Sequence, residues 1–138
     1  MTAFVLDASV AVAWCIDDEA SAHTDALLVR AGDGGIVVPP HWHLEVLNVL
    51  LMAEKRGRLQ NGAAAIRLQT FAKIQIAVDD EMAALAWTRV REIAQGQNLT
   101  AYDAAYLELA SRNILPLATL DRALADAARR AGVELLLD

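Results

Sequence analysis

Residues 3–15, AFVLDASVAVAWC, place a short β-type run directly before small and apolar residues of helical period, with Asp7 at the junction. A strand followed by a helix is the repeating unit of parallel α/β sheets. Similar apolar runs follow at 35–38 (GIVV), 74–78 (IQIAV), 114–119 (ILPLAT) and 133–137 (VELLL), separated by longer helical stretches. This alternation predicts an α/β fold with three layers, in which helices cover both faces of a parallel sheet of about five strands.

Seven stretches have the period of a helix. Thr100 and Asp121 stand where N-caps belong, and Gly132 is placed to end the last helix. No linker, repeat or low-complexity segment interrupts the pattern, so we expect one domain over residues 1–138. The expected helices cover residues 8–15, 18–31, 41–56, 60–73, 81–96, 101–112 and 122–131.

Composition narrows the class of protein. The chain of 138 residues is 56% hydrophobic, which is ample for a packed core. No apolar run reaches the roughly 20 residues that a membrane helix needs, and no basic segment precedes the first run, so we expect a cytoplasmic protein without a secretory signal. The single Cys15 lies among apolar neighbours and is predicted to be buried.

The net charge of −6 argues against a protein that binds nucleic acid through a broad basic surface. The objection loses force if the acids gather at one metal site, because a bound cation reverses the local field. Short basic clusters also occur, at 55–58, 89–91 and 129–130, although solvated helix faces explain each of them equally well.

Three acids stand at helix starts, two of them after apolar runs. Asp7 ends the first run, Asp121 follows the fourth, and Asp103 comes three residues after Thr100. An N-cap or a capping box is a sufficient local explanation for each acid taken separately. Taken together they suggest a site, because functional groups of open parallel sheets lie beyond the carboxyl ends of the strands.

Glu45 is harder to explain by local structure. It lies in HLEVLNVLLMA (43–53), a helical stretch that is apolar almost all round, with Asn48 one turn later. A buried carboxylate is costly unless it is paired, bound to metal or protonated. Glu45 therefore either reaches solvent at the helix rim or has a partner within the protein.

These residues carry a resemblance to a known family. The segments VLDASVAVAW, HLEVLN, LTAYDAAYLELA and LATLDRALADAARRAGV are similar to the successive motifs of the PIN-domain ribonucleases, in order and over nearly the whole chain. Within that family the chain most resembles the VapC toxins of bacterial toxin–antitoxin pairs. The resemblance implies that Asp7, Glu45, Asp103 and Asp121 are the catalytic, metal-binding acids, supported by Ser9, Asn48 and Thr119.

The chemistry of such a site follows from its carboxylates. Mg²⁺ and Mn²⁺ prefer oxygen ligands, and one or two ions held by several acids activate water and stabilise the leaving oxygen of a phosphodiester. The resemblance thus implies an Mg²⁺- or Mn²⁺-dependent endoribonuclease that hydrolyses RNA by metal-activated water. It also implies a VapB-like antitoxin and a homodimer as partners.

Other interpretations are weaker. The three histidines lack zinc-ligand spacing, so surface or capping roles are expected for them, and Trp14, Trp42 and Trp87 are assigned to the core. A haloacid dehalogenase phosphatase needs a second acid at position 9, and a receiver domain needs an acid pair near the first strand. The stronger alternative is a non-catalytic α/β module that binds a protein partner.

Overall fold

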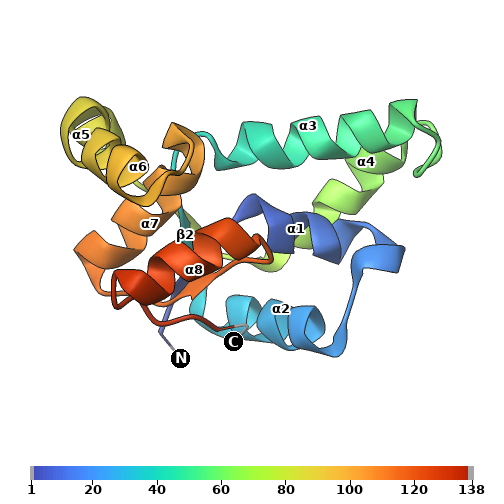
Figure 1. Ribbon diagram of the computed structural model, residues 1–138. Helices are drawn as coiled ribbons and strands as arrows, with labels where there is room; N and C mark the ends of the chain where they lie inside the picture. The colour runs from blue at the N-terminus through green and yellow to red at the C-terminus, as the bar shows by residue number, and fades with distance from the viewer. Residues whose placement is uncertain (1, 137–138) are drawn as a thin grey trace.

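Four short strands form a parallel sheet at the centre of the structure, a computed structural model that describes residues 2–136 (Figure 1). The strands are β1 (Phe4–Leu6), β2 (Ile36–Val38), β3 (Ile76–Val78) and β4 (Leu117–Ala118), and their order in the sheet is β3-β2-β1-β4. Val5 pairs with Val37 on one side and with Leu117 on the other, so β1 is a central strand. All three residues of β1 are fully buried, as expected of a parallel strand covered on both faces.

Helices surround the sheet. Helix α1 packs against α2 and α3, while α7 packs against β1, α6 and α8. The described helical segments are α1 (Ala8–Cys15), η1 (Asp17–Glu19), α2 (Ala22–Gly34), α3 (Trp42–Lys55), α4 (Ala63–Arg67), η2 (Leu68–Lys73), α5 (Met82–Leu85), η3 (Ala86–Val90), α6 (Arg91–Gln97), α7 (Ala101–Asn113) and α8 (Arg122–Arg130).

The α/β class is confirmed, but the expected count of about five strands is wrong. The segment predicted as the fifth strand forms one isolated bridge, between Leu135 and Leu117, and residue 137 lies outside the described residues. The neighbouring β4 is two residues long, and Pro116 and Ala118 turn their carbonyls toward β1, where they accept the N–H groups of Val5 and Asp7. On the opposite side of β4, Leu117 donates its N–H to Glu134 and accepts from Leu136, but the N–H of Leu115 is bound to Ala110 at the end of α7, so the pairing does not extend.

Three expected helices have different bounds. The stretch predicted over 60–73 divides into α4 and the 3₁₀ segment η2. The stretch predicted over 18–31 divides into the 3₁₀ turn η1 and helix α2, which begins after the N-cap Ser21. Ser21 and Thr24 form a reciprocal capping box, and a threonine in the second position hides this motif from a search for Glu or Gln. The stretch predicted over 81–96 contains η3, a π-helical segment that changes which residues face inward.

The tryptophans differ in burial. Trp42 is buried and Trp14 is partly buried against the core, but Trp87 is 87% exposed, so its assignment to the core is wrong. It lies in η3, where Val90 is the residue that turns inward. Cys15 is fully buried and free, as predicted. None of the described helices is long and apolar enough to cross a membrane.

Candidate active site

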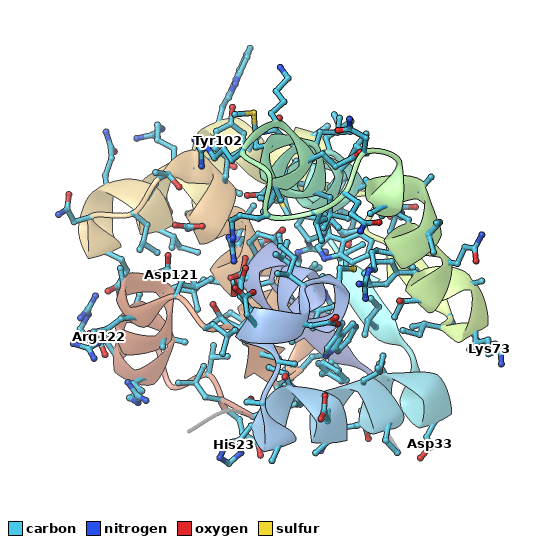
Figure 2. All side chains as sticks on the ribbon, turned by 90° about the vertical axis from the view of Figure 1, so that its right-hand side faces the viewer. His23, Asp33, Lys73, Tyr102, Asp121 and Arg122 are labelled. Carbon is cyan, nitrogen blue, oxygen red and sulfur yellow. The ribbon has the colours of Figure 1, made fainter. Side chains whose placement is uncertain are left out.

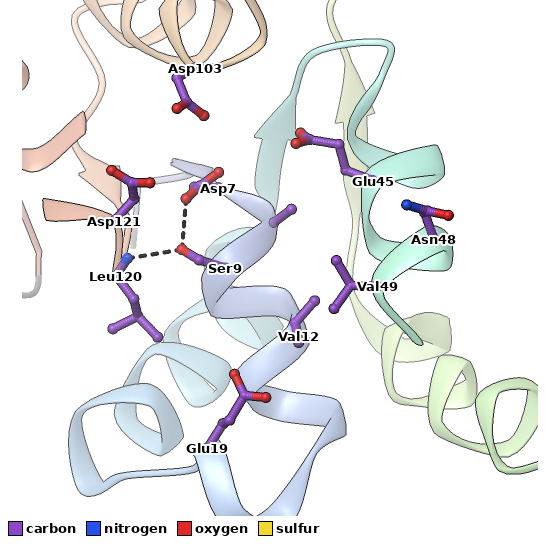
Figure 3. Close-up of a pocket in the computed structure, with 11 residues that line it drawn as sticks. Asp7, Ser9, Val12, Glu19, Glu45, Asn48, Val49, Asp103, Leu120 and Asp121 are labelled. Atoms are coloured by element: carbon purple, nitrogen blue, oxygen red, sulfur yellow. Dashed lines mark hydrogen bonds between the residues drawn. The ribbon is translucent and has the colours of Figure 1, made fainter. Parts of the chain in front are cut away.

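A cleft of about 400 Å³ opens at the carboxyl edge of the sheet and is lined by all four predicted acids (Figure 3). Asp7 follows β1 and Asp121 stands just beyond β4, and these two strands are parallel neighbours whose ends meet at one edge. Asp103 and Glu45 come from the first turns of α7 and α3. Four distant segments of the chain thus bring carboxylates to one place.

Asp7 is the most buried of the four acids, with 5% of its surface exposed. It occupies the N-cap position of α1, yet its side chain makes no capping hydrogen bond. Its Oδ2 instead accepts hydrogen bonds from the hydroxyls of Ser9 (2.6 Å) and Thr119 (2.7 Å). Among the described residues, no hydrogen bond goes to Oδ1, so that oxygen is available to a cation.

The two hydroxyls are themselves held in place. Ser9 Oγ accepts the backbone N–H of Leu120 at 2.9 Å, and Thr119 Oγ1 accepts that of Asp121 at 3.0 Å. Each hydroxyl therefore accepts a hydrogen bond from a backbone N–H and donates one to Asp7. This arrangement fixes the orientation of the Asp7 carboxylate. That Ser9 and Thr119 support the acids in function stays a prediction.

The burial of Asp7 opposes its ionisation. Desolvation raises the pKa of Asp7 above its usual value, although the hydrogen bonds from Ser9 and Thr119 oppose this rise. Repulsion by the nearby charges of Glu45 and Asp121 adds to the rise. A bound divalent cation would reverse the balance, since it favours the charged form of every carboxylate around it.

Glu45 has partners that sequence reasoning did not identify. Its Oε1 accepts a hydrogen bond of 2.6 Å from the hydroxyl of Tyr106, and His41 Nε2 lies 3.2 Å from the same oxygen. The His41 contact has the distance of an ion pair without the alignment of a hydrogen bond. Burial raises the pKa of Glu45, but the contacts with His41 and Tyr106 outweigh it and the pKa is lowered. Glu45 is therefore held as a carboxylate at the cleft wall.

Asp103 is held less firmly. The hydroxyl of Thr100 accepts the backbone N–H of Asp103 at 3.1 Å, so the capping interaction involves the main chain of this residue. Burial, followed by repulsion from Asp7, Asp121 and Glu45, raises the pKa of the Asp103 carboxyl to about 6. Because the charges of the other three acids raise its pKa, Asp103 belongs to the same cluster of carboxylates.

Asp121 serves two purposes. Its Oδ1 accepts the backbone N–H of Leu124 at 3.0 Å, which is the N-cap of α8 predicted from the sequence. The same side chain faces Asp7 and Asp103 across the cleft (Figure 3). Asp121 therefore caps α8 and also contributes its carboxylate to the cleft.

Other predicted residues have mixed outcomes. Asn48 lines the cleft from α3 but is exposed and makes no hydrogen bond to an acid among the described residues, so its supporting role stays a prediction. Of the histidines, His23 and His43 are exposed, whereas His41 is half-buried beside Glu45. A tyrosine in an apolar helix usually finds a hydrogen-bond partner, and this rule could have drawn attention to Tyr106.

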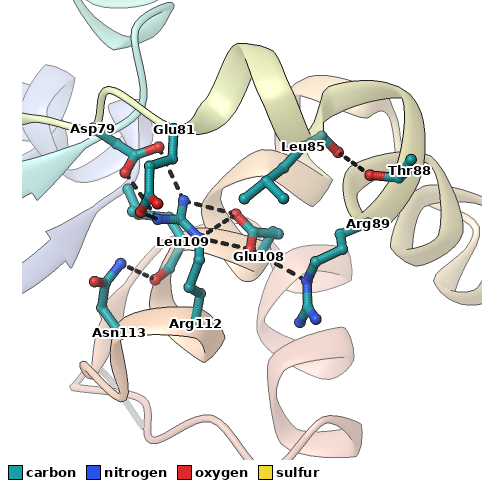
Figure 4. Close-up of polar contacts among 9 residues, drawn as sticks. All are labelled: Asp79, Glu81, Leu85, Thr88, Arg89, Glu108, Leu109, Arg112 and Asn113. Atoms are coloured by element: carbon teal, nitrogen blue, oxygen red, sulfur yellow. Dashed lines mark hydrogen bonds and ion pairs between the residues drawn. The ribbon is translucent and has the colours of Figure 1, made fainter.

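A second acidic group lies elsewhere. Asp79, Asp80 and Glu81 bring one ligand atom each within 4.8 Å of one another. Arg112 neutralises two of them, with contacts of 2.9 Å to Asp79 and 2.7 Å to Glu81 (Figure 4). Charge pairing within the protein therefore explains this group without a metal.

The cleft has the donor set that Mg²⁺ or Mn²⁺ requires. Its polar lining consists of carboxylate, hydroxyl and amide oxygens, which hard divalent cations prefer. Among the described residues no arginine, lysine or histidine lines it; His41 contacts Glu45 and Arg58 contacts Glu19 from outside the lining, but Asp7, Asp103 and Asp121 have no ion pair. The arrangement is suited to holding cations beside an anionic phosphodiester.

A parallel α/β sheet with an acid-lined cleft at its carboxyl edge defines the protein as an α/β domain with a candidate metal-binding site. Comparison with known proteins identifies the family. The family model of the PIN domain matches residues 4–130. The chain belongs to the PIN-domain family, whose members are typically metal-dependent nucleases. No curated protein matches the sequence significantly.

Solved structures agree on the fold. Seven chains of known structure match significantly. One is PAE2754 from Pyrobaculum aerophilum, whose crystal structure is similar with a TM-score of 0.68 and 24% sequence identity over 91% of this chain and 86% of that chain. At this identity the similarity bears on the fold alone.

Proposed function

We propose that this chain is an endoribonuclease dependent on Mg²⁺ or Mn²⁺, which acts in the cytoplasm as the toxin of a VapBC-type toxin–antitoxin pair. The observation that carries the proposal is the state of Asp7. It is a buried carboxylate with one oxygen held by Ser9 and Thr119, and three further acids surround it at the same cleft. Such an arrangement is unfavourable without a cation and has no capping role to explain it.

The four acids are proposed to have two different roles. Asp7 and Asp103 are proposed as direct ligands, because both have raised pKa values that a cation would correct. Glu45 and Asp121 are proposed to orient metal-bound water or to complete a second site. When bound, the metal supplies a polarised water as nucleophile and stabilises the leaving oxygen. Ser9 and Thr119 keep the Asp7 carboxylate in one orientation throughout.

The partners follow from the toxin proposal. An antitoxin tail that presents a cation to the acids would silence the cleft, and the protein would self-associate as a dimer. Sedimentation velocity at micromolar concentration tests the dimer, since a monomeric boundary would contradict it.

RNA cleavage tests the nuclease directly. Purified wild-type protein with Mn²⁺ should cut a mixed single-stranded RNA, and chelation with EDTA should stop it. Asp7→Asn keeps the shape of the side chain but removes the charge that holds the cation, so cleavage should fall at least about a hundredfold. Equal residual cutting by the wild type and Asp7→Asn would point to a contaminating nuclease and contradict the proposal.

Asp33→Asn is the matched control. Asp33 lies on α2, at the periphery of the molecule and away from the acid cleft (Figure 2). This substitution removes one negative charge as Asp7→Asn does, so unchanged cleavage by Asp33→Asn separates loss of a ligand from loss of net charge. For the toxin role, induced expression of the wild type should arrest growth while Asp7→Asn should not.

A further inference from the structure

The acid cleft continues beyond the four proposed ligands. It runs along α1 toward η1, where Glu19 closes its far end (Figure 3). The acids at the sheet edge and Glu19 therefore stand at opposite ends of one pocket. Glu19 is not among the charges that raise the pKa of Asp7 or of Asp103, so it stands apart from that group of acids.

Glu19 is held in position. Its Oε2 accepts a hydrogen bond of 3.0 Å from Nη2 of Arg58, which also lies 3.2 Å from Asp18 Oδ1. The side chain of Glu19 is 34% exposed, compared with 73% for Asp18. Of these two acids, only Glu19 lines the cleft. Arg58 thus fixes the carboxylate at the edge of the pocket through Oε2, and no hydrogen bond to Oε1 occurs among the described residues.

The walls between the two ends are apolar. Val12 of α1 forms part of the floor, and Val49 and Leu120 flank it. Val49 is 41% exposed and Leu120 is 49% exposed, so two of the large exposed apolar side chains of the molecule face this cleft. A flat apolar group could lie against them, with polar atoms at its edge reaching Glu19.

From this geometry we infer that the cleft binds a guanine base beside the scissile phosphate, with Glu19 accepting hydrogen bonds from its Watson–Crick edge. The inference rests on the proposed nuclease function, and it names the nucleotide that the same cleft selects. A single-stranded RNA exposes that edge to the protein, as duplex RNA does not. The phosphate would lie at the four acids and the base against Val12, Val49 and Leu120.

Guanine is the base that suits a carboxylate. Its edge offers two adjacent donors, N1–H and the 2-amino group, which match Oε1 of the Glu19 carboxylate and the second acceptor position of Oε2, whose first position accepts from Arg58. Adenine and cytosine each offer one amino group next to a ring nitrogen acceptor, and uracil offers one N–H between two carbonyls. A well-placed bidentate pair between a side chain and a base discriminates by about tenfold or more.

Sequencing the ends that the protein produces from a randomised single-stranded RNA tests the inference. The wild type should enrich guanine at one position next to the cut by about tenfold over adenine. Glu19→Gln replaces one acceptor oxygen by a donor, so the preference should fall to about twofold or less, because cleavage next to guanine falls while cleavage next to the other bases continues. An unchanged profile in Glu19→Gln, or a wild-type profile without guanine, would overturn it.

Asp18→Asn is the matched control, because it weakens the same pairing with Arg58 without altering the lining of the cleft. It should keep the guanine preference. If Asp18→Asn loses the preference as fully as Glu19→Gln, the ion pair acts on local structure and the base contact is wrong.

A binding experiment separates this inference from the nuclease proposal. Guanosine and adenosine 5′-monophosphates are titrated into the protein in the presence of Mg²⁺, and chemical shifts are followed. Tighter binding of the guanosine nucleotide to the wild type, lost in Glu19→Gln, supports the base site even if no RNA is cut. Equal affinities for the two nucleotides overturn it whatever the cleavage assay gives.

Discussion

Asp103 offers the clearest pH-dependent test at the scale of one residue. Its carboxyl pKa of about 6 lies above the ordinary value of 3.8, so the folded protein binds this proton more tightly than the unfolded chain does. The associated stability is present below about pH 4 and is lost as the pH rises through 6. Without metal, the charged Asp103 therefore weakens the folded state at neutral pH.

Asp103→Asn removes that charge and should stabilise the metal-free protein at pH 7.5. One pKa unit corresponds to about 1.36 kcal/mol, and because this side chain is partly exposed we discount the effect to roughly 1 kcal/mol. Urea unfolding in EDTA at pH 7.5 and at pH 4 measures it: the difference between variant and wild type should be present at the higher pH and absent at the lower. An equal difference at both values would contradict the electrostatic origin.

Thr119 tests how far the orientation of Asp7 matters. Thr119→Val keeps the shape of the side chain but removes the hydroxyl that donates to Asp7 Oδ2 and accepts the N–H of Asp121. Groups that orient a metal ligand typically contribute tenfold to a hundredfold to affinity or activity, so Mn²⁺-dependent cleavage should fall by that amount. Thr88→Val, an identical change at an exposed threonine of η3, should leave cleavage unchanged.

Among helices and strands, the sequence predicts correctly those in which apolar pattern, residue size and capping residues indicate the same structure. The first run and helix α1 have their expected positions because apolar pattern, small residues and burial coincide there. The last predicted strand fails because its pairing depends on β4, which is two residues long, lies over a dozen residues earlier in the chain and pairs with it through Leu117. A run of apolar residues does not show whether a neighbouring strand can pair with it.

The site follows the same rule. Asp7, Asp103 and Asp121 are recognisable because each stands at a helix start, which is a local pattern. Tyr106 is 61 residues from its partner Glu45, and no local pattern joins the two. Glu19 was not identified either, because in DDEA it resembles part of a solvated acidic turn, and only the packing of η1 brings it to the cleft.

Helix α7 depends on a buried ion-pair network for its position. Glu108 is fully buried and accepts hydrogen bonds from Arg112, which also binds Asp79 in the segment after β3 (Figure 4). The pKa of Arg112 is raised, first by its hydrogen bonds to Glu108 and Asp79, so it stays charged. The network joins α7, which carries Asp103, to the edge of the sheet.

Arg112→Ala should therefore destabilise the protein by roughly 3 kcal/mol, because it leaves the buried Glu108 carboxylate without its main partner. Arg67→Ala breaks a pair with Asp17 whose side chain is 84% exposed, and it should lower the free energy of unfolding by less than about 1 kcal/mol. Denaturation by urea compares the two variants. Similar losses would mean that Arg112 does not compensate a buried charge.

For the whole molecule, the acid cleft couples the stability of the fold to the binding of a metal ion. The cleft collects charge from β1, α3, α7 and the start of α8, so its repulsion acts on the packing of the entire domain. A cation that binds only the folded state stabilises it by an amount that grows with concentration, about 2.7 kcal/mol at a hundred times the dissociation constant. For a domain of this size that amount corresponds to a rise in melting temperature of several degrees.

Thermal unfolding with and without Mn²⁺ measures this linkage. The wild type should gain several degrees on adding Mn²⁺, and Asp103→Asn should start from a higher melting temperature without metal and gain much less. In Asp103→Asn the melting temperature without metal rises, whereas the gain on adding Mn²⁺ falls. Both follow from one carboxylate, which destabilises the metal-free cleft and holds the cation when metal is bound. Asp33→Asn should gain as much as the wild type, since Asp33 is remote from the cleft. An equal gain in all three proteins would show that Mn²⁺ binds elsewhere, and the ligand assignment would then be wrong.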